Sequence, residues 1–596
     1  MRLFQPDFKQ TKKQFELFLK FVRLILPHKA KWIFIILLGG FWTLLSVVNP
    51  YITKLVVDEG IMKSDLRRFI ALAALGIVIF IILGAINGLK EYLEKKVSLE
   101  VKFSLNKIVF DKINKLSLSW FRTKSTGENI YKISNDIDRV NSLITTIPPK
   151  AVMLFPRVIF IFLIMLKLNY KIALFSLLLA PFLYIGPYYF IKKRRSIWEK
   201  LIECSQGIFK FLHESFSHSY LIKAFGKERE EKDKYLKILK DNIEIEKTST
   251  KLNIFNSFVA RIADKIIVGL ITFYGGYHVI KGEMTLGSLT AILVYLGQLV
   301  GMQHGFIGFF QSTVLGLVSC ERIAGILDEK EEITETCDAK DILIKKGEIE
   351  FKKVNFGYSK GKAILKDLDF KIEGGRHISL AGSSGQGKTT ILNLIARLYD
   401  ADSGEIMIDR QYIKDITLNS LKKQISMALQ ETFLFNTSVK DNILYGDGNA
   451  SLEDVIRVSK ISLVDSFTEN LPEKYDTVIG ENACKISEGQ KQKIAIARAL
   501  IKNPKVLILD EAFSSMDSAS EDKIISNIKE NFKDITVVSV SHRLSTVKQS
   551  DLVYFLNNSG GIEVGKPEEL LEKNMEFEEL FKGQRELTIS DPGSNT

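Results

Sequence analysis

Cysteine is scarce in this chain, with only four residues among 596. The four positions are Cys204, Cys320, Cys337 and Cys484. No two of them stand at the short spacing of a zinc site or a disulfide framework, so neither is expected, and a reducing cytosol suits them. The first residues also lack the basic, apolar and small-residue succession of a signal peptide.

Acidic residues are outnumbered: 82 Lys and Arg face 70 Asp and Glu, for a formal net charge of +12. Hydrophobic residues make up 46% of the chain but crowd into long runs in its first half. A basic excess beside such runs favours a membrane protein over a nucleic-acid partner, so we expect no nucleic acid. A chain of this length also needs two or more domains.

Six apolar runs in the first half are long enough to cross a membrane, because a hydrocarbon core about 30 Å thick needs about 20 helical residues. The runs are 32–56, 69–89, 151–166 with a start near 144, 172–191, 262–280 and 286–309. They predict a transmembrane domain of six helices over 31–320, preceded by a cytoplasmic elbow segment at 1–30.

Two long polar loops, 90–143 and 192–255, are rich in Lys, and the N-terminal segment is rich in Lys as well. The other connections between runs are short. The positive-inside tendency therefore places these loops, both termini and the second half of the chain in the cytoplasm. The long loops carry helix-forming sequence, and a hairpin of fifty residues would project about 35 Å from the bilayer.

A few charges fall within or near these runs. Arg157 lies inside the third, where it either packs in the bundle or lines a cavity. A cavity position would favour an anionic or zwitterionic substrate. Arg261, Asp264 and Lys265 lie near the inner end of the fifth run, where interfacial snorkelling is the simpler interpretation.

The stretch 382–390, GSSGQGKTT, matches the phosphate-loop pattern. It stands between the strand-like run 377–381 and the helical run 391–396, which is the context that the pattern requires. Its glycines let backbone N–H groups point at phosphate oxygens, and the helix N-terminus adds positive charge. Lys388 can reach the β- and γ-phosphates, and the Thr389 hydroxyl can bind Mg²⁺.

After a charged linker at 321–346, short strand-like runs alternate with helical ones, which predicts an α/β nucleotide-binding domain over 347–583 and a disordered tail at 584–596. The apolar run 506–509 reads as a buried parallel strand. Asp510 at its end can hold Mg²⁺, and Glu511 can orient or deprotonate an attacking water.

These motifs and their order resemble those of the ABC transporter family, in particular exporters whose membrane and ATPase domains share one chain. The segments that carry the resemblance are Walker A at 382–390, Walker B at 506–511, the signature at 486–490 and the D-loop at 514–517. Single residues that match are Gln430 of the Q-loop, the switch histidine His542 and the adenine-stacking Tyr358. The resemblance covers nearly the whole chain and implies a type IV exporter architecture.

The resemblance also implies roles for residues, with ATP and Mg²⁺ as cofactors. Catalytic roles fall to Glu511, His542 and Gln430. ATP contacts fall to Tyr358, Ser383, Ser384, Gly385, Gln386, Gly387, Lys388, Thr389 and Thr390, and in trans to Ser487, Gly489, Gln490 and Asp517. Mg²⁺ ligands would be Thr389, Gln430 and Asp510.

One complete nucleotide site therefore needs two chains, a second copy or a related half-transporter. Glu488 departs from the family pattern, which has glycine there. A homodimer is the preferred interpretation, and a heterodimer with one impaired site stays open.

The expected function is ATP-driven export or flipping of a small amphiphile, a lipid, a drug-like compound or a peptide, across a membrane. No cysteine protease domain precedes the first run, which argues against exporters that cleave peptide leaders. A membrane-anchored regulatory ATPase is the alternative. A composition rich in Lys, Ile and Asn suggests a bacterial plasma membrane.

Overall fold

The computed structural model describes residues 16–123, 126–336, 338–358, 362–480, 485–558 and 560–589, without the side chains of 122–132, 179–196, 583–589 and a few single positions. The described chain divides into two compact units. The first is formed by Met1–Leu116 and Phe121–Lys330, the second by Ser117–Trp120 and Glu331–Thr596. The tip of the first long loop thus belongs with the second unit.

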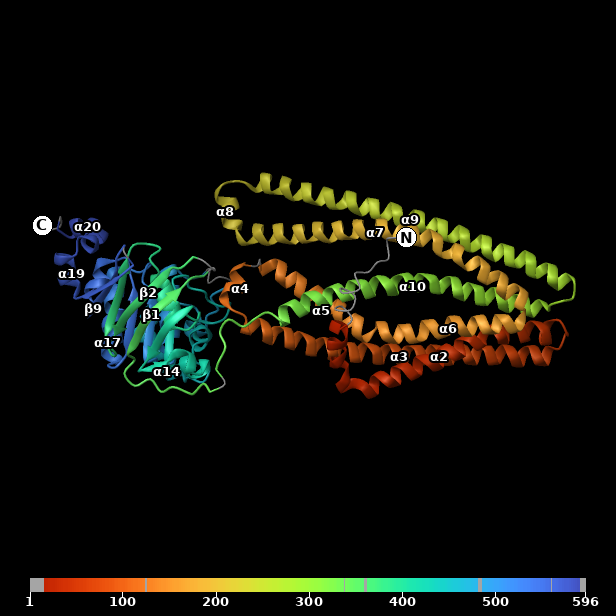
Figure 1. Cartoon of the computed structure of the whole chain (residues 1–596), viewed down its shortest axis with the longest axis horizontal. Helices are drawn as coiled ribbons and strands as arrows, with labels where there is room; N and C mark the ends of the chain where they lie inside the picture. The colour runs from red at the N-terminus through yellow and green to blue at the C-terminus, as the bar shows by residue number, and fades with distance from the viewer. Residues whose placement is uncertain are drawn as a thin grey trace. The chain divides into compact units, whose positions relative to one another are not determined.

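The first unit is helical (Figure 1). Its long helices are α2 (Lys29–Leu55), α3 (Leu66–Lys115), α6 (Ile147–Leu168), α7 (Tyr170–Ser217), α9 (Glu228–Ile280) and α10 (Leu286–Leu327). Shorter elements are η2 (Arg23–His28), the π-helical η3 (Val56–Ile61), α4 (Leu118–Thr123), α5 (Thr126–Thr145) and α8 (Ser219–Ala224). Each of the six predicted apolar runs falls on one of the six long helices.

Three helices of the described chain are long and apolar enough to cross a membrane, Glu16–Ile61, Leu66–Lys115 and Ile147–Leu168, and Leu286–Met302 is a shorter apolar one. The most apolar stretch of Leu66–Lys115 has none of its residues buried within this single chain. Its apolar surface therefore faces lipid or another chain.

Short capped turns explain the predicted tight hairpins. Asn169 alone separates α6 from α7, and its side chain accepts a hydrogen bond from the Ile172 N–H at 3.1 Å. Thr285 caps α10 in the same way, accepting from the Ser288 N–H at 3.1 Å. The third span begins at Ile147 rather than near 144, because two prolines stand at the start of α6, where proline fits a helix.

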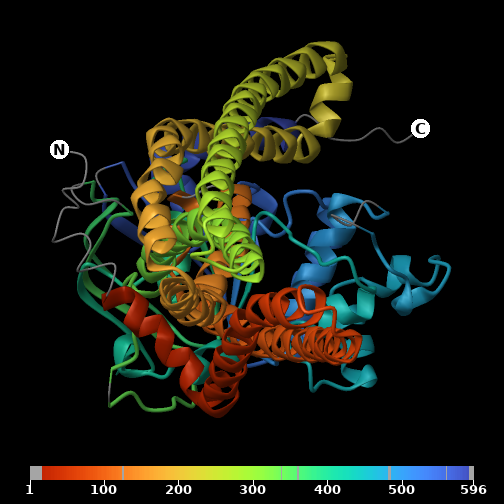
Figure 2. The same cartoon turned by 90° about the vertical axis from the view of Figure 1, so that its right-hand side faces the viewer.

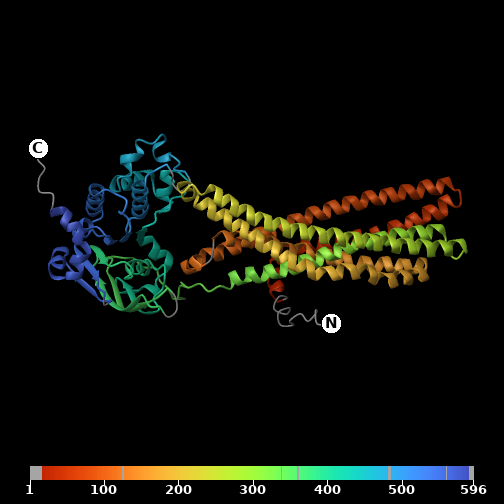
Figure 3. The ribbon, with the colours of Figure 1, turned by 90° about the horizontal axis from the view of Figure 1, so that it is seen from above.

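The six long helices do not form one uniform bundle. α2 packs against α3, α6 and α10, while α7 and α9 pack chiefly on each other. Figure 2 shows the α7–α9 pair leaning away from the other helices toward its α8 end, and Figure 3 shows the helices from above. The ends of α7 and α9 next to α8 are thus left with much apolar surface uncovered by this chain.

The second unit holds two sheets. One is antiparallel with strand order β2-β1-β4-β5, and the other has order β10-β9-β3-β8-β7-β6. The strands are β1 (Ile349–Phe356), β2 (Leu365–Ile372), β3 (His377–Gly382), β4 (Ser403–Ile408), β5 (Gln411–Tyr412), β6 (Ile425–Ala428), β7 (Val506–Asp510), β8 (Thr536–Val540), β9 (Leu552–Leu556) and β10 (Ile562–Gly565).

Helices complete this unit, and they connect or cover the strands. They are α11 (Lys388–Ile395), α12 (Leu418–Gln424), α13 (Val439–Leu444), α14 (Leu452–Ile461), α15 (Asp465–Thr468), α16 (Glu488–Leu500), α17 (Ser518–Asn531), α18 (Leu544–Lys548), α19 (Pro567–Lys573) and α20 (Met575–Ile589), with the short η4 (Ile413–Asp415) and η5 (Lys474–Asp476). The predicted disordered tail at 584–596 begins too early, because α20 continues to Ile589, and its remainder from 590 onward lies outside the described residues.

Strands β3, β7 and β8 are buried at every position, which explains the unbroken apolar run 506–509 of β7. β3 and β7 both pair in parallel with β8, and β6 pairs in parallel with β7. The carboxyl ends of all four strands consequently meet at one edge of the sheet, which is where open α/β sheets place their ligands.

Candidate functional site: a nucleotide site at the sheet edge

The phosphate loop links β3 to α11 through three glycines with positive φ. Gly382, Gly385 and Gly387 have φ of 149°, 85° and 93°. A Cβ at Gly382 would lie 2.3 Å from Gln386 Oε1 and 2.8 Å from the Leu556 carbonyl oxygen. No side chain fits there, so glycine is required for the loop to close over the strand end.

Lys388 lies folded over this loop. Its Nζ donates to the carbonyl oxygens of Gly382 at 2.7 Å and Ser383 at 2.9 Å, and the residue is only 7% exposed. Burial lowers the pKa of the Lys388 ammonium, while Glu511 and Asp510 oppose that change. Neutral carbonyls do not balance the charge, so the buried ammonium suits an anion such as a phosphate.

Asp510 stands at the end of β7 and is 2% exposed. The Thr389 hydroxyl donates to Asp510 Oδ1 at 3.4 Å. Burial and then the neighbouring Glu511 raise the pKa of Asp510 to about 6. A hydroxyl, a carboxylate and the amide oxygen of Gln430 are the hard oxygen ligands that Mg²⁺ prefers, so these residues fit the ion.

Glu511 connects the ends of three strands. Gln430 Nε2, after β6, donates to Glu511 Oε2 at 2.7 Å, and His542 Nε2, after β8, lies 3.2 Å from Glu511 Oε1. The Glu511 backbone has φ of 49°, a rare conformation for a residue with a side chain. Its N–H donates to the Val540 carbonyl oxygen at 3.1 Å, which holds this conformation in place. Three predicted catalytic residues are therefore in direct contact.

Tyr358 lies beside the helix that follows the phosphate loop. Its hydroxyl is 3.2 Å from Thr390 Oγ1 and accepts from Asn393 Nδ2 at 3.3 Å. Its ring packs edge-on against Phe356 and Tyr399, each at 5.1 Å between ring centres. Asn393 and Tyr399 fix the Tyr358 ring, and the sequence motifs gave no signal for either.

The signature segment begins α16. Ser487 is the N-cap: its Oγ accepts from the Gln490 N–H at 3.3 Å, and Gln490 Oε1 accepts from the Ser487 N–H at 2.9 Å. Glu488 is ion-paired along the helix with Lys491 Nζ at 2.6 Å. A Cβ at Gly489 would lie 2.9 Å from the Ser515 carbonyl oxygen, so this glycine allows close packing on the D-loop.

The D-loop leads into α17, where Asp517 is the N-cap and its Oδ2 accepts from the Ser520 N–H at 2.8 Å. That backbone N–H is the first cause that lowers the pKa of Asp517. Across the described residues, no hydrogen bond or ion pair joins Ser487, Gly489, Gln490 or Asp517 to the phosphate loop. One chain thus brings together the phosphate loop and its acids but leaves the signature apart.

Arg543 ties the D-loop to the switch histidine next to it in sequence. Its guanidinium donates to the carbonyl oxygens of Ser514 at 3.0 Å and Met516 at 2.6 Å. It also pairs with the fully buried Glu521 at 3.1 Å. Neither Arg543 nor Glu521 was predicted from the sequence, although the basic residue beside the switch histidine was the available signal.

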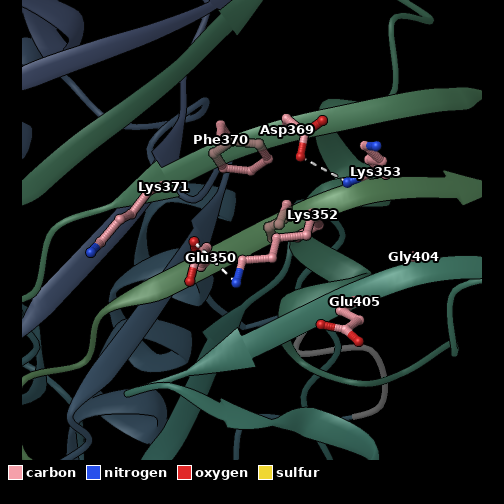
Figure 4. Close-up of a pocket in the computed structure, with 9 residues that line it drawn as sticks. Glu350, Lys352, Lys353, Asp369, Phe370, Lys371, Gly404 and Glu405 are labelled. Atoms are coloured by element: carbon pink, nitrogen blue, oxygen red, sulfur yellow. Dashed lines mark hydrogen bonds and ion pairs between the residues drawn. The ribbon is translucent and has the colours of Figure 1, made fainter.

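An open hollow of about 730 Å³ lies elsewhere on this unit, on the antiparallel sheet (Figure 4). It is lined by β1, β2 and β4, with Asp369 Oδ1 accepting from the Lys353 N–H at 2.8 Å and Glu350 3.7 Å from Lys352 Nζ. None of the predicted nucleotide residues lines it. The hollow is therefore not the nucleotide site.

Comparison with known proteins decides the family. Residues 32–303 match the family model described as the ABC transporter transmembrane region, and residues 365–514 match the one described as ABC transporter. A Staphylococcus aureus protein (strain bovine RF122 / ET3-1), which carries the name "Putative multidrug export ATP-binding/permease protein", is 31% identical over 95% of this chain and 99% of its own. The chain belongs to the ABC transporter family.

Two further likenesses extend along the whole transporter. An ATP-dependent lipid A-core flippase of Desulfotalea psychrophila (strain LSv54 / DSM 12343) is 32% identical over 91% of this chain and 94% of its own. A solved structure of a bacterial Atm1-family ABC exporter with ATP bound has a TM-score of 0.83 at 25% identity, covering 96% of this chain and 99% of that one.

The predicted fold is confirmed: this ABC transporter has a helical transmembrane domain fused to an α/β ABC ATPase domain, as the exporter structure does. It is an integral membrane protein that binds nucleotide and couples ATP hydrolysis to transport.

Proposed function

We propose that this ABC transporter exports or flips an amphiphilic molecule across a bacterial plasma membrane, using ATP sites that two copies of the chain share. The contact of Glu511 with Gln430 and His542, beside the phosphate loop, carries the proposal. These contacts fix the Glu511 carboxylate at the position where ATP hydrolysis requires a general base.

In this mechanism the phosphate loop and Lys388 bind the phosphates of ATP, and Thr389, Gln430 and Asp510 hold Mg²⁺. The ion, when bound, neutralises charge on the phosphates. Glu511 orients the attacking water and takes its proton, while Gln430 and His542 keep both of its oxygens in place. Tyr358 stacks on the adenine.

The remaining contacts come from a second copy, whose Ser487, Gly489, Gln490 and Asp517 close over the γ-phosphate. The Glu488–Lys491 ion pair supports a homodimer, because it neutralises the acidic side chain that the signature carries in place of glycine. A partner is also supported by apolar surface at the α7–α9 tip, where Phe216 is 75% exposed and Tyr220 86% exposed.

ATP shifts the equilibrium between inward-open and outward-open states because it contacts both ATPase domains only when they close. The long loops then carry closure to the membrane helices. The segment around Glu214 to Phe225 grips the ATPase domain of the second copy.

The test is Glu511→Gln in the full chain, alone in lipid nanodiscs. We expect steady-state ATP hydrolysis to fall about 100-fold or more, with ATP retained, because a general base contributes about 10²–10⁴-fold. Glu405→Gln, on the antiparallel sheet, is the matched control and keeps normal turnover. Near-normal hydrolysis by Glu511→Gln would refute the assigned role.

The same preparation separates the alternatives. Turnover by wild-type chain alone supports a homodimer, whereas turnover only with a second polypeptide supports a heterodimer. ATP-dependent movement of a labelled amphiphile in vesicles supports transport. Substrate-independent hydrolysis with no movement of any probe would favour a regulatory ATPase.

A further inference from the structure

Two cations converge on one tryptophan inside the transmembrane domain. The Arg157 guanidinium of α6 lies 5.0 Å from the centre of the Trp42 ring on α2. The Lys90 ammonium of α3 lies 5.7 Å from the same ring. Each distance is within the range of a cation–π contact. Trp42 therefore holds two like charges near each other in an apolar bundle.

The hydrogen bonds around Arg157 leave donors unused. Its terminal nitrogen donates to Gln298 Oε1 on α10 at 3.3 Å, a long contact. Its Nε is buried and has no hydrogen-bond partner. Lys90 reaches only the Met153 sulfur at 3.7 Å, a weak acceptor. Both cations can thus accept a stronger anionic partner.

The charges of this cluster do not balance within the described residues. There, no carboxylate lies within ion-pair distance of Lys90 or Arg157. Glu94 is one helical turn from Lys90, acts electrostatically on both Lys90 and Lys150, and has an oxygen without a hydrogen-bond partner. Neither Lys90 nor Arg157 is therefore ion-paired within the described residues, and unbalanced charge within a transmembrane domain is expensive and marks a functional site.

We propose that Lys90, Arg157 and Trp42 bind the anionic head, phosphate or carboxylate, of a lipid-like amphiphile, with the indole against the start of its apolar body. This rests on the proposed transport function and narrows its substrate class. Arg157 suits the role because a guanidinium binds phosphate and carboxylate through two parallel hydrogen bonds. All three residues are half-buried, so this chain alone does not fully cover the cluster.

The experiment uses the full chain in proteoliposomes, with fluorescent phosphatidylglycerol as the anionic probe and the equally labelled diacylglycerol as the neutral one. Wild-type protein should respond to phosphatidylglycerol at a lower concentration than to diacylglycerol, in both ATP hydrolysis and probe movement. Arg157→Gln and Lys90→Gln should each raise the half-maximal phosphatidylglycerol concentration about tenfold, as loss of a charge-assisted hydrogen bond implies. Neither should change the response to diacylglycerol.

Two variants guard against an effect of folding alone. Arg157→Lys keeps the charge and should recover part of the phosphatidylglycerol response. Arg261→Gln removes a charge from α9, where Arg261 lines a separate open hollow of about 450 Å³, and should leave both responses and basal hydrolysis unchanged.

Equal wild-type responses to the two probes, or variants with an unaltered phosphatidylglycerol response, would overturn the anionic site. Movement of diacylglycerol alone would then leave transport itself standing. Absence of ATP-dependent movement of both probes would also overturn the anionic site. If ATP hydrolysis were absent as well, the proposed transport function itself would have failed.

Discussion

Asp510 lies at the end of β7, in surroundings that disfavour the ionised form of its carboxyl group. Burial and the neighbouring Glu511 raise its pKa from 3.8 to about 6. Because the folded-state pKa is the higher one, the charged carboxylate destabilises the nucleotide-free domain, slightly near pH 4 and fully above pH 6. The shift corresponds to about 3 kcal/mol at pH 8 and about 1.5 kcal/mol at pH 5.

Asp510→Asn should therefore stabilise the ATPase domain when nucleotide and Mg²⁺ are absent. The amide keeps an oxygen for the Thr389 hydroxyl and removes the charge. The expected rise in unfolding temperature at pH 8 is at most about 6–12 °C, given about 2–4 °C per kcal/mol for a domain of this size. Scanning calorimetry of the full chain in nanodiscs measures it.

Two comparisons make this test decisive. At pH 5 the rise should shrink by about half, because wild-type Asp510 is then largely protonated in the folded state. With Mg²⁺ and ATP the order should reverse, because the variant lacks the carboxylate ligand that the ion prefers.

Asp517→Asn is the matched control, with the opposite sign. The Ser520 N–H lowers the pKa of the exposed Asp517 carboxylate. The ionised carboxylate therefore stabilises the folded domain above the pKa of the unfolded chain, and this stabilisation is lost as the pH falls through the folded-state pKa. No stabilisation is expected from this variant. An Asp510→Asn protein that melts at or below the wild-type temperature at pH 8, or whose gain is the same at pH 5, would refute the electrostatic reasoning.

Two further predictions concern packing and coupling. Gly39→Ala places a Cβ 1.8 Å from Met153 Cε, so the flexible Met153 side chain must move, and we expect a lower unfolding temperature than for Gly40→Ala, which has no atom within 4 Å. An equal effect of both alanines would contradict this. Arg543→Lys keeps a charge for the buried Glu521 but cannot bind two D-loop carbonyls as well. It should lower ATP hydrolysis at least several-fold with ATP affinity retained, and unchanged turnover would show that this link is dispensable.

Local patterns were enough to predict much of this molecule. The phosphate loop was readable because its glycines, Lys388 and Thr389 are adjacent in sequence and their conformation is set by local backbone rules. The buried strand ending in Asp510 was readable because a strand covered on both faces must be apolar throughout. The membrane helices followed from bilayer thickness in the same way.

Side-chain partners at long sequence separation were not readable. Arg157 left two interpretations open in the sequence, and only the packing of α2 against α3 and α6 places it and Lys90 on Trp42. The Glu488–Lys491 ion pair joins residues three apart and could have been predicted from helical spacing. That it lies in the first turn of the signature helix follows only from the start of α16 at Glu488.

The sequence by itself determined the kind of machine, because motifs, apolar length and strand burial are constraints that each segment satisfies locally. Only the tertiary structure decided which groups act together: the hold of Gln430 and His542 on Glu511, and the cations around Trp42. Such contacts depend on distances between segments tens to hundreds of residues apart, and those distances exist only once the helices and strands have packed.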